Sequence, residues 1–263
     1  MKFNTIRCEL FSETGVCVIT MNRPNELNAM SAQMFRELTQ LLVSIDGDPD
    51  VRCVVLTGEG RAFSSGGDLA EMKAGFGGHA GFYRHMQLAN RFLLTLAELN
   101  KPVIAAINGA AMGAGMNTAL ACDILIASEK AKFSEVFGNV GLSPDVGGTY
   151  LLARLVGHAK AKELVFSYKT IGAQEAKELG IVNDVVAPEQ LMETVMAMAE
   201  TIASGPTMAF AMAKRMINRS YEMDLATALH MEALSQTIAG NSDDHLEGVS
   251  AFFEKRPHQF KGQ

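Results

Sequence analysis

The fold is decided by the stretch RCVVLTGEGRAFSSGGD, residues 52–68. Its first part, Arg52–Thr57, is a short apolar run rich in β-branched residues, which predicts a buried strand. The strand leads into a glycine-rich loop, Gly58–Gly67. A helix is expected after Asp68, because Asp68 with Glu71 three residues later resembles a capping box. A strand, a glycine loop and a helix in this order indicate an α/β fold.

The same order of elements occurs again further along the chain. Val103–Ile107 predicts a second buried strand, which follows Pro102 and opens into the loop Gly109–Gly115. A short helix and the strand Ile124–Ala127 come next. Successive units of this kind favour parallel pairing of their strands. The expected class is therefore α/β with a parallel sheet.

The flanking segments add a hairpin at one end and helices at the other. The hairpin is predicted from Ile6–Phe11 and Val16–Met21, which alternate or are β-branched around a turn. Ser31 is a candidate N-cap for an amphipathic helix that runs to about Asp46. A late strand is expected at Ile181–Val186. From Glu189 onward the chain reads as nearly all helix.

Composition excludes several classes of function. The chain has 263 residues, with 23 Lys and Arg against 29 Asp and Glu, which gives a net charge of −6. This balance does not favour a nucleic-acid-binding face. The six histidines form no metal motif, so no metal is expected. The four cysteines show no CxxC spacing and are typical of a reducing compartment, so we expect a cytoplasmic protein.

The sequence gives no indication of a membrane segment. The N-terminal residues MKFNTIRCEL lack the apolar region of a signal peptide. The apolar stretch Val103–Ala127 is interrupted by Asn108, Asn117 and Asp123. A buried strand, loop, helix and strand explain this stretch better than a membrane span does.

The first glycine loop is a candidate anion site. Gly66 and Gly67 permit positive φ and close approach of the backbone to a ligand. The loop ends at a predicted helix N-terminus, where free N–H groups favour an anion or a developing oxyanion. A tight strand-to-helix turn is the alternative, and the loop taken alone favours it, since glycines are common in such turns. The loop has neither a P-loop lysine nor a Gly-x-Ser-x-Gly motif, so Ser64 and Ser65 are poor nucleophile candidates.

The second glycine loop contains GAGMNTA, residues 113–119, which fits the GxGxxA pattern of dinucleotide sites. The fit is weak, because the glycines begin six residues past the strand. The expected acid about twenty residues on has no obvious counterpart, since Glu135 follows Lys132–Ser134 rather than ending a recognisable strand. Close packing of small residues is the alternative, and a nicotinamide-dependent oxidoreductase remains open.

Asp145 lies in LSPDVGGT, residues 142–149. A Pro-Asp pair before two glycines is ordinary turn chemistry. The functional alternative is a carboxylate base held on a glycine-lined loop next to a helix start. The residues alone leave both interpretations open.

Six segments lie in order along the chain: NRPNELNA (22–29), AFSSGGDL (62–69), KPVIAAING (101–109), ACD (121–123), GLSPDVGGT (141–149) and FFEKRP (252–257). Taken together, these segments resemble the crotonase family, the enoyl-CoA hydratases and isomerases. The resemblance covers essentially the whole chain, in order. It implies a spiral of ββα units over residues 1–200. It also implies a helical region over 201–263 that closes the active site and assembles trimers or hexamers.

The resemblance also implies an acyl-CoA substrate and no cofactor beyond the coenzyme A that the substrate carries. The N–H groups of Ser65 and Ala114 would form the oxyanion hole, with Asp68 capping the helix behind it. Lys255 or Arg256 would reach a CoA phosphate, on a neighbouring subunit. The residues that would line the substrate site are Glu26, Leu27, Ala29, Ser65, Gly67, Asp68, Leu69, Gly113 and Phe137.

The departures from the family pattern decide the expected reaction. Family hydratases carry two glutamates at the positions of Asn117 and Phe137, and neither residue here can transfer a proton. Some family isomerases place one acid where Asp145 stands. The resemblance therefore implies double-bond migration, with Asp145 moving a proton from C2 to C4. An apolar lining of Phe137, Phe63 and Met116 would raise the pKa of Asp145.

Other functions stay open at this point. Hydration would need Glu135 or Asp145 in place of the missing glutamates, and a non-catalytic acyl-CoA-binding protein would need neither. A Clp-type peptidase is disfavoured, because the loop around Met112 offers no serine. We expect the acyl pocket to be shaped by the glycine-dense segment Gly75–Gly81 and the start of the helix after it, which carries Phe82, Tyr83, His85 and Met86.

Overall fold

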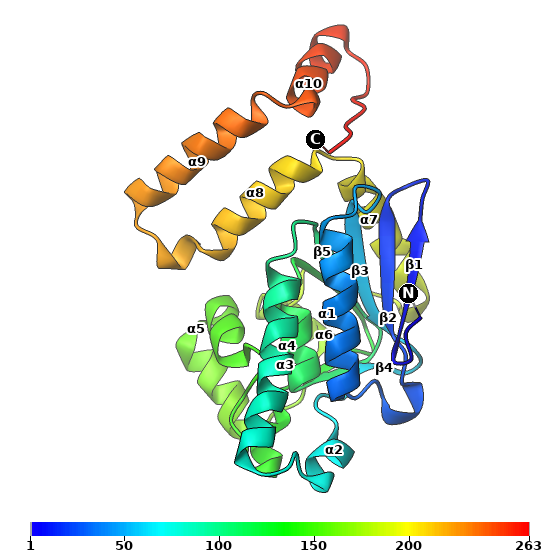
Figure 1. Ribbon diagram of the computed structural model, residues 1–263. Helices are drawn as coiled ribbons and strands as arrows, with labels where there is room; N and C mark the ends of the chain where they lie inside the picture. The colour runs from blue at the N-terminus through cyan, green and yellow to red at the C-terminus, as the bar shows by residue number, and fades with distance from the viewer. Residues whose placement is uncertain (1, 263) are drawn as a thin grey trace.

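A computed structural model describes residues 2–262 and contains two sheets (Figure 1). The larger sheet has the strand order β1-β2-β3-β5-β7-β10 and is parallel except for β1, which pairs antiparallel with β2. The predicted hairpin is thus confirmed, as are the buried parallel strands. The bounds are β1 Ile6–Phe11, β2 Val16–Met21, β3 Cys53–Gly58, β5 Val103–Ile107, β7 Ile124–Ser128 and β10 Asp184–Val186.

The smaller sheet has the order β4-β6-β8-β9, and two of its strands, β4 and β6, lie inside the segments that we expected to be loops. Its strands are β4 Ala62–Ser64, β6 Ala110–Met112, β8 Lys132–Ser134 and β9 Ile171–Gly172. The expectation that Gly58–Gly67 and Gly109–Gly115 are uninterrupted loops is therefore wrong. The physical reason is that β4, β6 and β8 pair in parallel with one another, which satisfies their backbone groups across distant parts of the chain.

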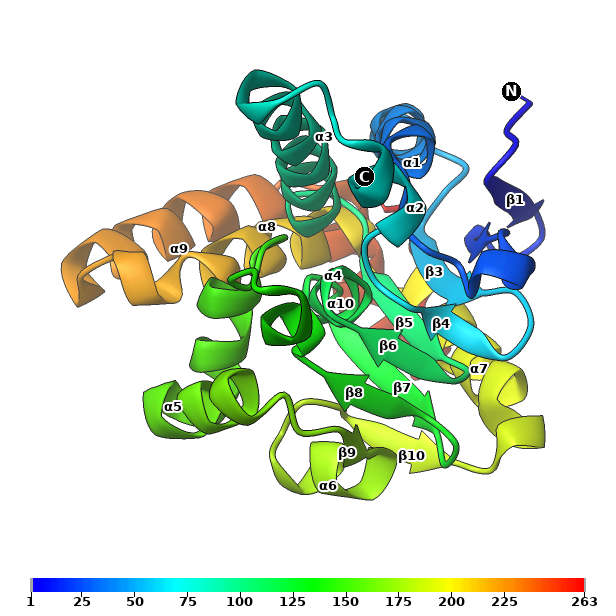
Figure 2. The same ribbon diagram turned by 90° about the horizontal axis from the view of Figure 1, so that it is seen from below.

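These paired short strands make a repeating unit (Figure 2). Strands β3, β5 and β7 each pass into a short strand of the second sheet and then into helical structure. The expected spiral of ββα units is confirmed. The helices that follow the units are α2 Leu69–Ala74, α4 Ala114–Leu120 and, after the 3-10 turn η2 Val136–Val140, α5 Gly148–Ser167. A non-helical residue, Gly157 at φ 75°, kinks α5.

Helices cover both faces of the larger sheet. Helix α1, Ala32–Asp46, packs on α3, His79–Ala97, over the main core, and the Ser31 hydroxyl accepts the Met34 N–H at 3.2 Å as its predicted N-cap. Helix α7, Leu191–Ala203, covers the other face through a separate apolar cluster. This double coverage explains why all six residues of β3 are buried.

Two predicted boundaries were wrong. The late strand is only β10, Asp184–Val186, not Ile181–Val186, because the Ile181 N–H donates to the Ala176 carbonyl at 2.8 Å and closes α6, Ala173–Glu178. Helix α3 starts at His79, inside the glycine-dense segment Gly75–Gly81 that we expected to precede it. The stretch Val103–Ala127 forms strand, loop, helix and strand as expected, and no helix within residues 2–262 is long and apolar enough to cross a membrane.

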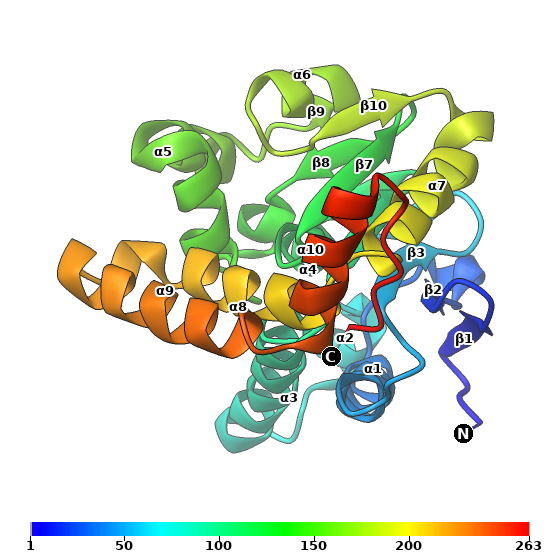
Figure 3. The same cartoon turned by 90° about the horizontal axis from the view of Figure 1, so that it is seen from above.

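The C-terminal helices extend away from the sheets (Figures 1 and 3). They are α8 Thr207–Asn218, α9 Leu225–Ala239 and α10 Asp243–Glu254. The predicted boundary after residue 200 lies within α7, and the role of 201–263 in assembly stays a prediction. Large apolar side chains of α9 and α10 are exposed in the single chain: Leu225, Leu229, Met231, Leu234, Ile238, Leu246, Val249, Phe252 and Phe253.

Candidate active site

The spiral brings the two glycine loops against each other. Gly66 has a φ of 96°, and a Cβ on it would lie only 2.7 Å from the Met112 carbonyl oxygen and 3.6 Å from the Ala114 nitrogen. Glycine is therefore required here for both conformation and space. The first loop lies beside the N-terminus of α4, as a paired anion site needs.

The hydrogen bonds of the first loop change which N–H is available. The Ser65 N–H donates to the Leu27 carbonyl at 2.9 Å, and the Gly66 N–H donates to the Ser64 hydroxyl at 3.2 Å. The Gly67 N–H, by contrast, donates to no group within residues 2–262. The prediction that Ser65 supplies the oxyanion donor is therefore wrong for this structure, because its N–H is already used. Gly67 is the available donor on this loop.

The second loop supplies a donor at the start of α4. Ala114 is the first residue of this buried helix, where N–H groups have no intrahelical partner. The preceding residue, Gly113, has a φ of 49°, and its N–H donates to the Ser134 carbonyl at 2.8 Å. Ring atoms of Phe137 would lie 3.4 Å from a Cβ on Gly113. Predicted residues Gly113, Ala114 and Phe137 thus lie together.

Asp68 caps α2 as predicted, but the capping box is incomplete. Its Oδ1 accepts the N–H groups of Ala70 at 2.9 Å and Glu71 at 3.2 Å. Burial raises the pKa of Asp68, but the bonds from Arg23, 2.8 Å away, and from the helix outweigh this and leave the pKa below its usual range. The Glu71 carboxylate accepts the Ala32 N–H at 2.9 Å instead of returning to Asp68. It therefore connects α2 to α1.

The Asp145 loop is fixed from two directions. The Asp145 carbonyl accepts the Asn117 side-chain amide at 2.8 Å and the Gly148 N–H at 3.0 Å. Val146 and Gly147 follow at φ 46° and 76°, and Val146 is buried. A β-branched residue at positive φ is strained, and such strain persists only where the surroundings hold it. The surrounding structure therefore holds this loop in one conformation, unlike a simple surface turn.

The Asp145 carboxyl is poised to exchange a proton near neutral pH. Burial raises its pKa to about 6, against the partly compensating hydrogen bond from its own backbone. Its Oδ1 is buried without a hydrogen-bond partner among residues 2–262. A carboxylate tuned in this way suits a general base.

Glu135 is a site residue that the sequence did not place beside Asp145. It is 1% exposed, and its Oε2 lies 3.5 Å from the Asn117 amide nitrogen. Burial raises its pKa to about 7, the Asn117 bond opposes this, and the Asp145 charge adds to it. The available signal was an acid directly after the buried strand Lys132–Ser134.

The raised pKa of Glu135 predicts a pH-dependent stability. Because Glu135 has a higher pKa in the folded protein than its ordinary value of 4.5, the free energy of unfolding should fall as the pH rises from about 4.5 to about 7. Glu135→Gln cannot ionise, so it should be more stable than the wild type by about 1–3 kcal/mol above pH 8. Near pH 4 the wild type and Glu135→Gln should have the same free energy of unfolding. Urea unfolding near pH 4 and above pH 8 measures these free energies. A difference between the two proteins that is the same at both pH values would contradict the prediction.

The predicted coenzyme-A-lining residues are only partly brought together. Glu26 ends the 3-10 turn η1, Pro24–Glu26, its carbonyl accepts the Ser65 hydroxyl at 3.3 Å, and Leu27 follows at φ 51°. Ala29 and the 61%-exposed Leu69 flank the same loop. Lys255, in contrast, ends α10, at the opposite end of the molecule from α2 (Figure 1). Within one chain Lys255 does not reach this site.

The segment expected to shape the acyl pocket is internally packed. The His85 ring stacks on Phe76 at 4.3 Å between centroids and meets the edge of Phe35 at 5.8 Å. Burial lowers the pKa of His85. Gly81 is required, because a Cβ there would collide with the Phe76 carbonyl. His85 therefore anchors the start of α3, while Tyr83 beside it is exposed.

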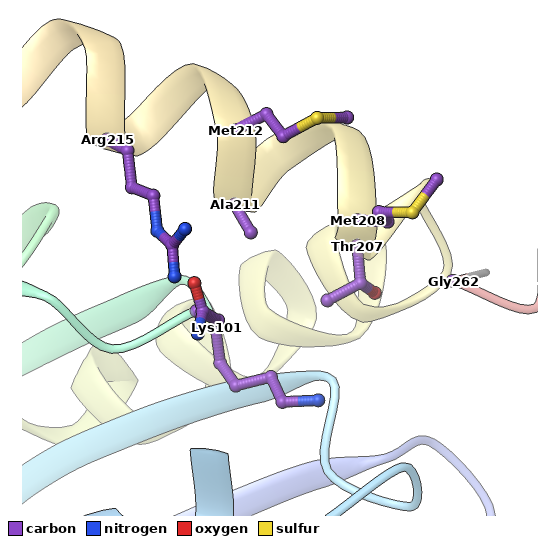
Figure 4. Close-up of a pocket in the computed structure, with 8 residues that line it drawn as sticks. Lys101, Thr207, Met208, Ala211, Met212, Arg215 and Gly262 are labelled. Carbon is purple, nitrogen blue, oxygen red and sulfur yellow. The ribbon is translucent and has the colours of Figure 1, made fainter. Parts of the chain in front are cut away.

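A separate cavity of about 260 Å³ lies between α8 and the segment that precedes β5 (Figure 4). It contains none of the predicted site residues. Its lining is Asn100, Lys101, Thr207, Met208, Ala211, Met212, Arg215 and Gly262.

The fold and the site together define a crotonase-type protein, in which the N-termini and loops of a ββα spiral surround a buried carboxylate. The chain belongs to the enoyl-CoA hydratase/isomerase family, whose model matches residues 12–263.

Individual relatives carry both activities in their names. The chain is 40% identical to a 1,2-epoxyphenylacetyl-CoA isomerase of Escherichia coli strain K12, over 95% of this chain and 97% of the relative. It is 38% identical to a short-chain-enoyl-CoA hydratase of Clostridium acetobutylicum, with 97% of each covered. The solved enoyl-CoA hydratase of Bacillus anthracis superposes with a TM-score of 0.94 at 37% identity, covering 99% of this chain and 100% of that one. These relatives do not distinguish isomerisation from hydration.

Proposed function

We propose that this enzyme acts on an acyl-CoA thioester and moves a carbon–carbon double bond within the acyl chain. The observation that carries the proposal is the half-buried Asp145 carboxyl, whose Oδ1 has no hydrogen-bond partner within residues 2–262. Burial raises its pKa to about 6. Its loop is tied through Asn117 to the helix that begins at Ala114. A base and an oxyanion donor are thereby held by one short helix.

The proposed reaction uses a single carboxylate. The thioester oxygen accepts the N–H groups of Gly67 and Ala114. Asp145 removes a proton from C2, and the resulting enolate is stabilised by the two donors, each worth about 3 kcal/mol in such sites. Asp145 then returns the proton at C4. No metal or redox group is required, because the proton leaves and re-enters the same molecule.

The residues at the family's glutamate positions favour migration over water addition. Asn117 and Phe137 occupy the positions where the family hydratases carry their two acids, and neither can activate water. Phe137 instead packs beside Gly113, where an apolar ring helps to exclude water. One relative is named as an isomerase of an epoxyphenylacetyl-CoA, a reaction that resembles double-bond migration in leaving the mass of the substrate unchanged.

Hydration is the second candidate, because Glu135 gives the site a second carboxyl, which is buried beside Asn117. The two candidates differ in the mass of the product. A panel of linear and ring-derived enoyl-CoAs in ¹⁸O water should yield products of unchanged mass with altered absorbance. A product that gains labelled water would establish hydration. Tight binding without any turnover across the panel would indicate a non-catalytic acyl-CoA-binding protein.

We also propose that the chain assembles as a homotrimer or hexamer through its C-terminal helices. The exposed Phe252 and Phe253 of α10 support this, since large apolar side chains gathered on one region mark interaction surfaces. In such an assembly Lys255 would approach the coenzyme A of a neighbouring subunit.

The assembly proposal predicts a mass of three or six chains by light scattering. Phe252→Ser with Phe253→Ser should lower the mass, because the change removes apolar contact area. Tyr83→Ser, an exposed aromatic on α3, is the matched control and should leave the mass unchanged. A monomeric wild type would exclude the proposal.

A further inference from the structure

Three buried side-chain oxygens at the Asp145 loop accept no hydrogen bond within residues 2–262. They are the Asn117 Oδ1, the Glu135 Oε1 and the Asp145 Oδ1. They come from three elements: α4, the start of η2 and the loop before α5. The Asn117 amide links the other two, through its contacts with Glu135 Oε2 and the Asp145 carbonyl.

Counting donors indicates which group carries a proton. The Asn117 side chain has two N–H bonds to give, and both are directed at the contacts just described. Two ionised carboxylates would add only acceptors, and buried acceptors without partners are costly. A neutral carboxylic acid supplies one donor and removes one charge. Glu135, at 1% exposed, is the more enclosed of the two acids and the poorer place for a charge.

Asn117 has little freedom to adjust to a change at Glu135. A Cβ on Gly148, the first residue of α5, would lie 2.3 Å from its amide nitrogen, so the amide packs directly on the helix backbone. A second charge at Glu135 therefore acts on a rigid amide that also holds the Asp145 carbonyl. Asp145 is the ionisable group within residues 2–262 whose charge acts on Glu135.

We propose that Glu135 is a positioning residue for the isomerase reaction: as a neutral acid it holds Asn117 and hence the Asp145 loop, and when it loses its proton the site becomes inactive. This inference rests on the proposed function, in which Asp145 is the base. The added negative charge opposes formation of the enolate. It also makes Glu135 the stronger acceptor, which draws the Asn117 amide toward Glu135 and away from the Asp145 carbonyl that the amide holds. Glu135 itself exchanges no proton with the substrate.

The ionisation of Asp145 and that of Glu135 should both shape the pH dependence of kcat/KM. Activity should rise as Asp145 loses its proton and fall as Glu135 loses its own, which gives a bell-shaped kcat/KM with limbs near pH 6 and 7. In Glu135→Gln the side chain beside Asn117 is neutral at all pH values, as the protonated acid is. It should retain the acid limb and lose the alkaline one, so that its activity at pH 9 exceeds the wild type by about tenfold or more.

The test compares the pH profiles of four proteins on one 3-enoyl-CoA: the wild type, Glu135→Gln, Asp145→Asn and Glu129→Gln. Glu129 is an exposed acid after β7 and should leave the profile unchanged. An unchanged profile in Glu135→Gln overturns the inference. A folded Glu135→Gln that is as inactive as Asp145→Asn at every pH also overturns it, because Glu135 would then be catalytic itself.

The inference and the proposed function fail in distinguishable ways. Full activity of Asp145→Asn would remove the proposed function whatever Glu135 does. If Glu135→Gln does not fold, a ¹³C NMR titration of the glutamate side chains in the wild-type protein provides the same information. One carboxyl should titrate together with the alkaline limb of activity. Absence of any glutamate titrating in that range overturns the inference.

Discussion

Replacing Asp145 with asparagine is expected to lower kcat for the isomerisation of a 3-enoyl-CoA by about 10²–10⁴-fold, the usual contribution of a positioned general base. The amide cannot accept the C2 proton. The backbone carbonyl that Asn117 and Gly148 hold is unchanged by the substitution, so the loop should keep its shape. KM should change little, because the side chain does not carry the thioester contacts.

The matched control is Asp184→Asn, an acid on β10 with a side chain about half exposed. It forms an ion pair with Lys177 and has no place in the proposed site. Its kcat should remain within about twofold of the wild type, since exposed pairs contribute little. If Asp145→Asn and Asp184→Asn behave alike, Asp145 is not the base. A steep loss in Asp145→Asn with an unaltered unfolding curve supports the assignment.

Removing the Ala114 N–H is expected to lower kcat by about 10²–10³-fold, the cost of one oxyanion donor. Ala114→Pro makes this change at the first position of α4, where proline is tolerated because the N–H has no intrahelical partner. The preceding Gly113, at φ 49°, has the freedom to adapt. Hence the loss should appear in kcat more than in stability.

Ala114→Gly is the control for this experiment, because it keeps the N–H while removing the methyl group. It should retain most of the activity, although glycine destabilises a helix by up to about 1 kcal/mol. The ratio of Ala114→Gly to Ala114→Pro activity therefore isolates the donor. Equal kcat values for the two folded variants would mean that Ala114 does not hold the thioester oxygen.

Local patterns were sufficient for much of the fold. The hairpin, the Ser31-capped α1 and the buried β3 were predicted with bounds within a residue or two, because alternation, capping and β-branched runs act over short range. The strands β4 and β6 were missed because each has only three residues. They pair with each other across almost fifty residues of sequence, and no local signal indicates this pairing.

Some residues of the candidate site could be predicted from the sequence and others could not. The glycine loops, Ala114 and Asp145 followed from motif and resemblance. In the structure the two loops lie in contact, and Asn117 links the Asp145 loop to the helix that begins at Ala114. Ser65 was the wrong choice of donor, since its N–H is used by Leu27, a residue that reaches the loop only through the fold. Glu135 was missed as a neighbour of Asp145 for the same reason. Contacts between distant segments, rather than residue type, decide which groups are available.

The central claim is that Asp145 carries one proton from C2 to C4 of a bound acyl-CoA. The most direct test is a 3-enoyl-CoA doubly deuterated at C2, converted under single-turnover conditions and analysed by NMR and mass spectrometry. The account predicts deuterium at C4 of a 2-enoyl-CoA product with the wild type, and no such product with Asp145→Asn at matched times. A product that has gained water, or deuterium transfer that persists without the Asp145 carboxylate, would contradict it.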